Sequence, residues 1–258
     1  MPEFTEYAPG APRWVDVTSP ELDRTISFYV ELFGWESEQD SRPEAGGYAM
    51  FSKDGKLVAG ATPPQQEGMP SSWATYLATD DVDATVGRIR EAGGSLLLEP
   101  LDVFADGRMA VAQDPTGAAF SIWQAGEHHG AQLANEPGSL AWNECQTNDA
   151  ETAAAFYCAV FGYEVEAVPM GEGEPYRVLK LGEKSVAGIF ELNDELRGAP
   201  ASWATVFAVA DADEAVARAQ ELGGTVLVPP LDIPDVGRFA ALQDPVGAVF
   251  QVLADPAS

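Results

Sequence analysis

Two short segments place a carboxylate two residues after a tryptophan. They are Trp14-Val15-Asp16 and Trp142-Asn143-Glu144, in a chain of 258 residues. Residues two apart on a β-strand point to the same face, so each carboxylate is expected to lie beside an indole. In a partly dry cavity that setting raises the pKa of a carboxyl group and suits general acid–base chemistry. Asp16 and Glu144 are therefore candidate catalytic residues.

The same two carboxylates have a structural interpretation, in which each pairs with an arginine or caps backbone amides. Arg108 and Arg238 each follow a glycine, at matching positions before a predicted strand. The rigid guanidinium fork binds a carboxylate of the protein or of a ligand equally well. Asp102 and Asp232 are alternative partners for these arginines. Both interpretations remain open from the sequence.

The strands and helices that must position these residues are predicted from sequence segments that occur more than once in the chain. The segment that begins at Ser72 is repeated in the segment that begins at Ser202. The two align at a constant shift with roughly half of their positions identical, which indicates duplicated structural units. Phe28-Tyr29 likewise returns as Phe156-Tyr157. Apolar spacing and turn residues predict a strand, a helix and three strands in each unit, and the first helix is expected to open at Ser19 and Pro20. Four such units are predicted, two in each half.

This organisation predicts an α+β protein with two domains, at residues 1–126 and 139–258. Residues 127–138 are polar, rich in glycine and without periodicity, and we interpret them as a linker. His128 and His129 are the chain's only histidines. They are neighbours within this linker, so a shared metal ion is awkward on an extended chain, and we expect both to be solvated.

Composition excludes several classes of partner. Forty-one acidic and fourteen basic residues give a formal charge of −27, which repels nucleic acids and anionic membranes. No apolar run approaches the roughly 20 residues of a membrane span, and no signal-peptide pattern begins the chain. We expect a cytoplasmic monomer or homodimer that binds a small molecule, with Cys145 and Cys158 as buried thiols.

Four motifs, each present in both halves, resemble those of the vicinal-oxygen-chelate superfamily of glyoxalases, bleomycin-resistance proteins and extradiol dioxygenases. They are FYVELFGW and FYCAVFGY, the D-x-D that opens the second helix of each half, the Gly-Gly that follows this helix, and DPTGAAF and DPVGAVF. The closest resemblance is to tandem glyoxalase-like proteins of actinobacterial type. It implies two glyoxalase-like domains made of βαβββ units, each an incomplete barrel with a ligand-binding cleft.

The resemblance also implies where a metal ion would bind. Its ligand positions fall on one residue of the first strand, one of the second unit and one of the last strand of each half: Trp14, Ala74 and Ser121, and Trp142, Ala204 and Gln251. Divalent ions need several converging His, Asp or Glu donors, which these positions lack. We therefore predict neither a metal nor a cofactor.

The remaining candidate side chains for the two clefts are mainly aromatic. Trp14, Tyr48, Tyr76 and Trp123 are candidates to line the first cleft, and Trp142, Tyr176 and Phe207 are candidates in the second. Trp73 and Trp203 adjoin the vacated ligand positions, and the remaining candidates for ligand binding are polar: Arg108, Ser121, Arg238 and Gln251. The plainer interpretation of such aromatic clusters is ordinary core. Val206 and Leu253 replace Tyr76 and Trp123 in the second half, so the two sites are expected to differ.

These observations favour a protein that binds a small, largely apolar or aromatic metabolite in a metal-free cleft, as resistance and sequestration proteins do. The alternative is a metal-independent enzyme in which Asp16 or Glu144 moves protons on a carbonyl substrate. A metal-dependent glyoxalase-type lyase or dioxygenase is the third hypothesis, and it lacks the expected ligands.

Overall fold

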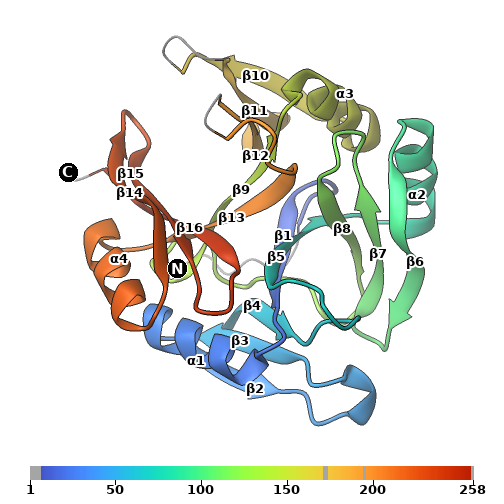
Figure 1. Cartoon of the computed structure of the whole chain (residues 1–258). Helices are drawn as coiled ribbons and strands as arrows, with labels where there is room; N and C mark the ends of the chain where they lie inside the picture. The colour runs from blue at the N-terminus through green and yellow to red at the C-terminus, as the bar shows by residue number, and fades with distance from the viewer. Residues whose placement is uncertain (1–6, 171–173, 194–195, 257–258) are drawn as a thin grey trace.

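The computed structural model describes residues 7–170, 174–193 and 196–256. The first half contains eight strands and two α-helices, with a short 3-10 turn at Pro43–Ala45. Along the chain these are β1 (Pro12–Thr18), α1 (Leu22–Phe33), β2 (Glu36–Gln39), β3 (Ala49–Lys53), β4 (Lys56–Thr62), β5 (Ser72–Ala78), α2 (Val82–Glu91), β6 (Ser95–Val103), β7 (Gly107–Gln113) and β8 (Ala119–Ala125) (Figure 1).

The second half repeats this series. Its elements are β9 (Ser139–Thr147), α3 (Ala150–Phe161), β10 (Glu164–Val168), β11 (Tyr176–Leu181), β12 (Lys184–Glu191), β13 (Ser202–Ala208), α4 (Ala212–Glu221), β14 (Thr225–Ile233), β15 (Gly237–Gln243) and β16 (Val249–Ala254).

Each half forms one eight-stranded sheet with the same strand order. The first runs β2-β3-β4-β1-β5-β8-β7-β6 and the second β10-β11-β12-β9-β13-β16-β15-β14. At the centre, β1 is antiparallel to β5, while β4 and β8 run parallel to their central neighbours. The predicted α+β class and the two tandem domains of strand–helix–three-strand units are confirmed. The sheets curve without closing (Figure 1).

The first helix begins later than its sequence signals predict. It starts at Leu22, so Pro20 precedes the helix instead of lying in its first turn. The Ser19 hydroxyl explains the delay, because it accepts hydrogen bonds from the backbone N–H of Glu21 and from the hydroxyl of Thr25. The helix ends as predicted at Gly34, whose φ of 67° is the left-handed conformation that glycine adopts easily.

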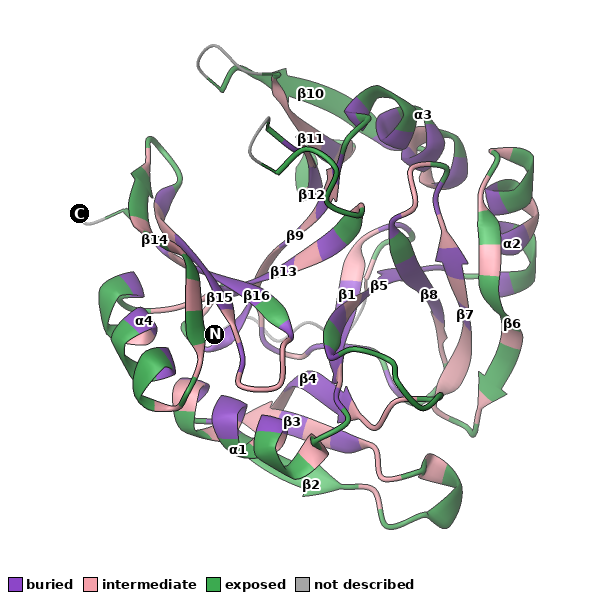
Figure 2. Ribbon diagram, in the orientation of Figure 1, coloured by how far each residue is buried: buried purple, intermediate pink, exposed green. Residues whose placement is uncertain are grey.

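The helices of one half lie against those of the other half. In Figure 1, α1 lies beside α4, and α2 beside α3. Phe28 and Phe33 of the first half share a core with Phe207 and Phe250 of the second. A matching core joins residues of α2, β7 and β8 to residues of α3, β9 and β12. The buried residues in Figure 2 follow these helix faces and the central strands, so the two halves share their cores.

A hydrogen-bonded chain crosses between the halves twice, at matching positions. Trp203 Nε1 donates to the Tyr157 hydroxyl at 2.7 Å, and this hydroxyl donates to Asp114 Oδ2 of the other half at 2.9 Å. In the counterpart, Trp73 donates to Tyr29 at 2.8 Å, and Tyr29 donates to Asp244 at 3.2 Å. The other oxygen of Asp114 accepts the amides of its own turn, at Thr116 and Ala118. Each aspartate therefore joins a turn of one half to a helix of the other.

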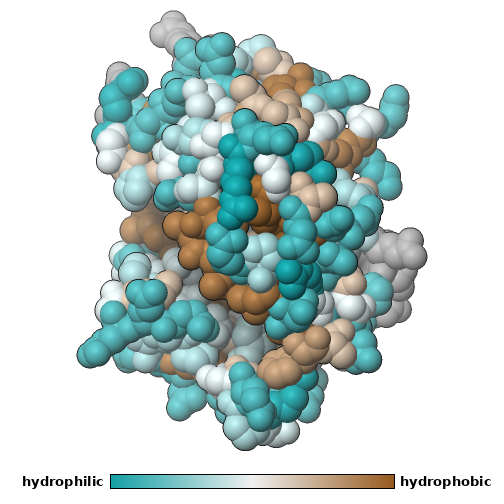
Figure 3. All heavy atoms as spheres, turned by 90° about the vertical axis from the view of Figure 1, so that its right-hand side faces the viewer, coloured by the Kyte–Doolittle hydropathy of each residue, from teal (hydrophilic) through white to brown (hydrophobic). Residues whose placement is uncertain are grey.

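The outer surface carries the charge. The face in Figure 3, which contains α2, β6 and β7, is mostly hydrophilic, with hydrophobic residues gathered in patches. Edge strand β6 exposes Leu97, Leu98 and Leu101.

None of the described helices has the length and apolar character needed to cross a membrane. Cys145 is buried, whereas Cys158 is only half-buried, contrary to the expectation for the second thiol.

Removing the Tyr157 hydroxyl should destabilise the protein. Tyr157→Phe leaves the buried Trp203 N–H and Asp114 Oδ2 short of a partner, which costs about 2–3 kcal/mol in the free energy of unfolding. Tyr29→Phe is the matched comparison and should cost less, because its bond to Asp244 is longer. Urea unfolding of the two variants measures both effects. Equal stability of wild type and Tyr157→Phe would contradict this account of the interface.

Candidate functional site

The first candidate site is one face of the central strands of the first sheet. Cross-strand register pairs Trp14 of β1 with Tyr76 of β5, and Tyr76 with Ser121 of β8. Asp16 and Trp123 follow on the same strand faces. Tyr48, just before β3, reaches this face with its hydroxyl. The structure thus brings together six predicted site residues: Trp14, Asp16, Tyr48, Tyr76, Ser121 and Trp123.

Asp16 is the acceptor at the centre of this group. Its Oδ2 accepts hydrogen bonds from the hydroxyls of Tyr76, at 2.8 Å, and Tyr48, at 3.2 Å. Trp14 Nε1 donates in turn to the Tyr48 hydroxyl at 2.9 Å. Burial raises the pKa of Asp16 from 3.8 to about 6, against the opposing effect of the two tyrosine hydrogen bonds. Asp16 neither pairs with an arginine nor caps amides among the described residues, so the structural interpretation was wrong for it.

A glycine in the neighbouring strand makes room for the Tyr48 hydroxyl. Gly60 lies directly across from Asp16 on β4, and a Cβ at Gly60 would overlap the hydroxyl. Gly188 has the same relation to Tyr176 in the second half. An isolated glycine within a strand often marks such a close approach. The repeated Val-Ala-Gly segments were therefore a signal for this contact, which sequence reasoning missed.

The second half repeats the same arrangement with glutamate. Trp142 Nε1 donates to the Tyr176 hydroxyl at 2.8 Å. Glu144 Oε1 accepts from Gln146 Nε2 at 3.0 Å, and Tyr176 is its second hydrogen-bonding neighbour. Burial raises the pKa of Glu144, and these two hydrogen bonds oppose the rise. Gln251 lies on the same face, where its cross-strand neighbour is Val206.

The two sites differ in their access to solvent. In the first half Trp14 and Asp16 are each 3% exposed and Tyr76 and Trp123 are buried beside them, while Tyr48 is half-buried. In the second half Trp142, Glu144 and Tyr176 are all half-buried. Val206 and Leu253 stand where the first half has Tyr76 and Trp123, so less side-chain volume covers the glutamate. The sequence predicted that the two sites differ, and the difference lies in burial: the first site is more closed and the second is more open to solvent.

His128 corrects our expectation for the linker. Its ring is buried and packs edge-on against Trp14, at 4.5 Å between centroids, and against Trp123. Burial, and then the charge of Arg13, lower its pKa to about 4. His129 is exposed, as expected. The polar, aperiodic sequence around His128 gave no sign of burial, because backbone bonds such as that of Ala131 to Arg13 hold this segment on the first sheet.

Three aromatic residues assigned to the clefts lie elsewhere. Trp73, Trp203 and Phe207 belong to the cores between the halves. Strand alternation is the reason, because Trp73 and Trp203 neighbour Ala74 and Ala204 and so point to the opposite face. Their indoles donate to Tyr29 and Tyr157 there. Assigning them to ligand binding was wrong, and the plainer interpretation as core was right for them.

The two predicted ligand-binding arginines are occupied by carboxylates of their own domain. Arg108 binds Asp102 at 2.8 Å and Asp83 at 3.1 Å. Arg238 binds Asp232 at 3.0 Å and also pairs with Asp213. Each therefore ties a helix to a β-hairpin at the surface. The alternative partners Asp102 and Asp232 were identified from the sequence, whereas a ligand-binding role for these arginines is not supported.

The residues present do not form a binding site for a divalent metal. Each site face offers one carboxylate, Asp16 or Glu144, among aromatic and amide side chains. Across the described ranges, no group of three or more His, Cys, Asp or Glu could hold an ion. Trp14, Ala74 and Ser121 in one half, and Trp142, Ala204 and Gln251 in the other, occupy the positions at which the resemblance implied ligands. The donor set does not suit Mn²⁺, Fe²⁺ or Zn²⁺.

The raised pKa of Asp16 should appear in the pH dependence of stability. As pH rises from about 4 to 6, an unfolded chain ionises this carboxyl while the folded protein keeps it protonated, so ionisation favours unfolding. Asp16→Asn cannot ionise and should gain up to about 3 kcal/mol relative to wild type between pH 4 and pH 7. Urea unfolding across this range measures the difference. Exposed Asp23→Asn is the control, and a constant offset between Asp16→Asn and wild type would refute the shift.

Known proteins resemble this chain in both halves. The Glyoxalase/Bleomycin resistance protein/Dioxygenase superfamily profile matches residues 12–122 and 139–252. A Mycobacterium tuberculosis protein whose name marks it as a proposed glyoxylase, CFP32, is 44% identical over 257 residues, covering 98% of each chain. The anthracycline biosynthesis protein DnrV of Streptomyces peucetius is 43% identical over 264 residues, covering 97% of this chain and 95% of DnrV.

Solved structures share the fold at low sequence identity. The Mn(II)-bound glyoxalase from Novosphingobium aromaticivorans superposes with a TM-score of 0.67 at 17% identity, covering 96% of this chain and 83% of that one. The 2,3-dioxygenase LapB from Pseudomonas sp. KL28 gives 0.67 at 14% identity, covering 97% and 94%. The profile match in both halves, with the relatives at 43% and 44% identity, shows that the chain belongs to the Glyoxalase/Bleomycin resistance protein/Dioxygenase superfamily as a protein of two tandem domains.

Proposed function

We propose that the protein binds a small, largely apolar or aromatic molecule at the Glu144 face of its second half, without a metal ion. The observation that carries this proposal is the half-buried group of Trp142, Tyr176 and Glu144, in which all three side chains keep some contact with solvent. It presents an indole, a phenol ring and a carboxyl group at a surface that solvent reaches. Its counterpart around Asp16 is closed by side chains.

The chemistry of this face fits a flat ligand that carries a hydroxyl or carbonyl oxygen. Rings of Trp142 and Tyr176 offer apolar surface for stacking. Gln251 is 5% exposed on the same face, and its side-chain amide can donate to a ligand oxygen that reaches it. Glu144, with its raised pKa, accepts a hydrogen bond from a ligand hydroxyl when ionised and donates one when protonated.

The relatives support an aromatic ligand. The Streptomyces peucetius relative is named for anthracycline biosynthesis, and it is similar to this chain over nearly the whole length of both. Anthracyclines are polycyclic aromatic compounds that carry hydroxyl and carbonyl groups. A ligand of this chemical type matches the aromatic and amide groups of the Glu144 face.

The second candidate function is metal-independent proton transfer on a carbonyl substrate. The raised carboxyl pKa values favour it, since a carboxyl group whose pKa burial has raised is a better general base when ionised and can return the proton. Glu144 is the better placed of the two carboxylates because it is only half-buried, whereas Asp16 is 3% exposed. Sequestration leaves the ligand unchanged, whereas this chemistry moves a proton on the substrate, so the two functions can be separated by product analysis.

Quinizarin (1,4-dihydroxyanthraquinone) is a suitable first probe, because it is flat and carries both hydroxyl and carbonyl oxygens. We expect it to quench tryptophan fluorescence in a saturable manner, and Trp142→Ala should weaken this binding by roughly tenfold through the lost apolar contact. Trp14→Phe, in the closed first site, is the matched control and should leave the affinity unchanged. Equal affinity of Trp142→Ala and wild type would rule out the Glu144 face as the site.

Glu144→Gln separates binding from catalysis. If the protein only binds, the variant should retain affinity within a few-fold and quinizarin should be recovered unchanged. If Glu144 moves a proton, conversion of the substrate should stop while binding persists. Chromatography of the probe after incubation with each protein, followed by the same measurement with carbonyl-containing analogues, distinguishes the outcomes.

A further inference from the structure

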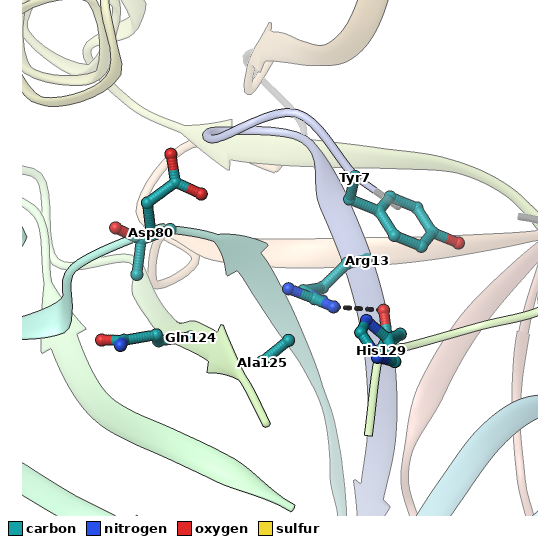
Figure 4. Close-up of a pocket in the computed structure, with 7 residues that line it drawn as sticks. Tyr7, Arg13, Asp80, Gln124, Ala125 and His129 are labelled. Atoms are coloured by element: carbon teal, nitrogen blue, oxygen red, sulfur yellow. Dashed lines mark hydrogen bonds between the residues drawn. The ribbon is translucent and has the colours of Figure 1, made fainter. Parts of the chain in front are cut away.

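An open pocket of about 300 Å³ lies at the start of β1, and none of the residues that line it belongs to either candidate site. Figure 4 shows side chains from β1, from the loop between β5 and α2, from the end of β8 and from the segment before β9 converging on it. The lining residues are Tyr7, Arg13, Thr79, Asp80, Gln124, Ala125 and His129. None of them was a candidate from the sequence.

Arg13 is the unusual member of this pocket. It is 4% exposed, and its guanidinium points into the pocket between Asp80, Gln124 and Ala125 (Figure 4). Nη2 donates to the backbone oxygen of His129, while Nε is buried without a hydrogen-bond partner. Asp80 is near enough for its charge to act on the pKa of Arg13, but the two side chains do not form an ion pair.

Arg13 differs from other arginines of the chain in its burial and in its carboxylate partners. Arg42, Arg108 and Arg238 are each bound by two carboxylates at the surface. Arg13 is far more buried, and in the described part of the chain no carboxylate is in ion-pair contact with it. A buried charge without a counter-ion is costly, because the interior solvates it poorly. The abundance of acidic residues makes the missing partner informative.

An oxyanion would supply what the pocket lacks. A guanidinium binds the paired oxygens of a carboxylate or phosphate through charge-assisted hydrogen bonds. Gln124 accepts a hydrogen bond from the Val82 amide through its Oε1, and this leaves its side-chain nitrogen free to donate. The volume corresponds to about ten water molecules and is at the lower end of small-molecule sites.

We propose that this pocket binds a small oxyanion, a carboxylate or a phosphate, with Arg13 as the principal ligand-binding residue and Gln124 as a second donor. Asp80, on the pocket wall, opposes highly charged anions. The site is independent of the proposed function, because its lining residues include none of the Trp142, Tyr176 and Glu144 group. Failure of either proposal therefore leaves the other intact.

Sodium acetate and sodium phosphate, each compared with sodium chloride at equal ionic strength, test the site on the full chain. We expect saturable shifts of the Arg13 Nε–H resonance in nitrogen-15 NMR with at least one of the two oxyanions and none with chloride. The probe that binds more tightly identifies carboxylate or phosphate as the preferred group. Absence of a saturable shift with both oxyanions would overturn the proposal.

Two variants assign the binding to this pocket. Arg13→Gln removes the charge and should weaken binding by at least tenfold, as measured by calorimetry. Exposed Asp80→Asn leaves the fold undisturbed and should tighten binding by roughly threefold or more, because it removes a like charge. Arg24→Gln, whose arginine pairs with Glu21 at the surface, is the control. An affinity that does not change in Asp80→Asn, or that changes equally in Arg24→Gln, would contradict the assignment even if Arg13→Gln does not fold.

Discussion

The rest of the structure depends on the burial of one face of each sheet between the two halves. Aromatic residues from both halves form the shared cores there, and the paired chains from Trp73 and Tyr29 to Asp244, and from Trp203 and Tyr157 to Asp114, fix how the halves meet. Carboxylates in an apolar interface are tolerated because tyrosine and turn amides satisfy them. With one face of each sheet used in this way, the opposite face carries the candidate sites.

Duplication gave each half the same hydrogen-bonded group, and neighbouring side chains then made the two groups different. Trp14 donates to Tyr48 beside Asp16 in the first half. Trp142 donates in the same way to Tyr176 beside Glu144 in the second. In the first half Tyr76 donates to the carboxylate, and His128 packs against Trp14 and Trp123 beside it. The second half lacks these covering rings. The two sites therefore differ in their contact with solvent, although both use the same strand positions.

The arginines also fall into two groups: some pair with carboxylates at the surface, and one is buried without such a pair among the described residues. Surface arginines at the β-hairpins each pair with two carboxylates of their own domain and so reduce the repulsion between those acidic neighbours. Arg13 has the opposite environment, with little solvent and no carboxylate in contact among the described residues. The same type of side chain is therefore paired with carboxylates in one place and buried without a carboxylate partner among the described residues in another.

The sequence by itself determined the α+β class, the four repeated units and the strand alternation that puts Trp14 with Asp16 and Trp142 with Glu144, because these depend on local spacing. It also indicated Tyr48 and Tyr176 through their matching positions and the family resemblance. Only the tertiary structure decided that Trp73 and Trp203 turn toward the other half, that Arg108 and Arg238 are held by carboxylates, and that His128 is buried. Those outcomes depend on which face packs against a distant segment, and local sequence does not encode such long-range contacts.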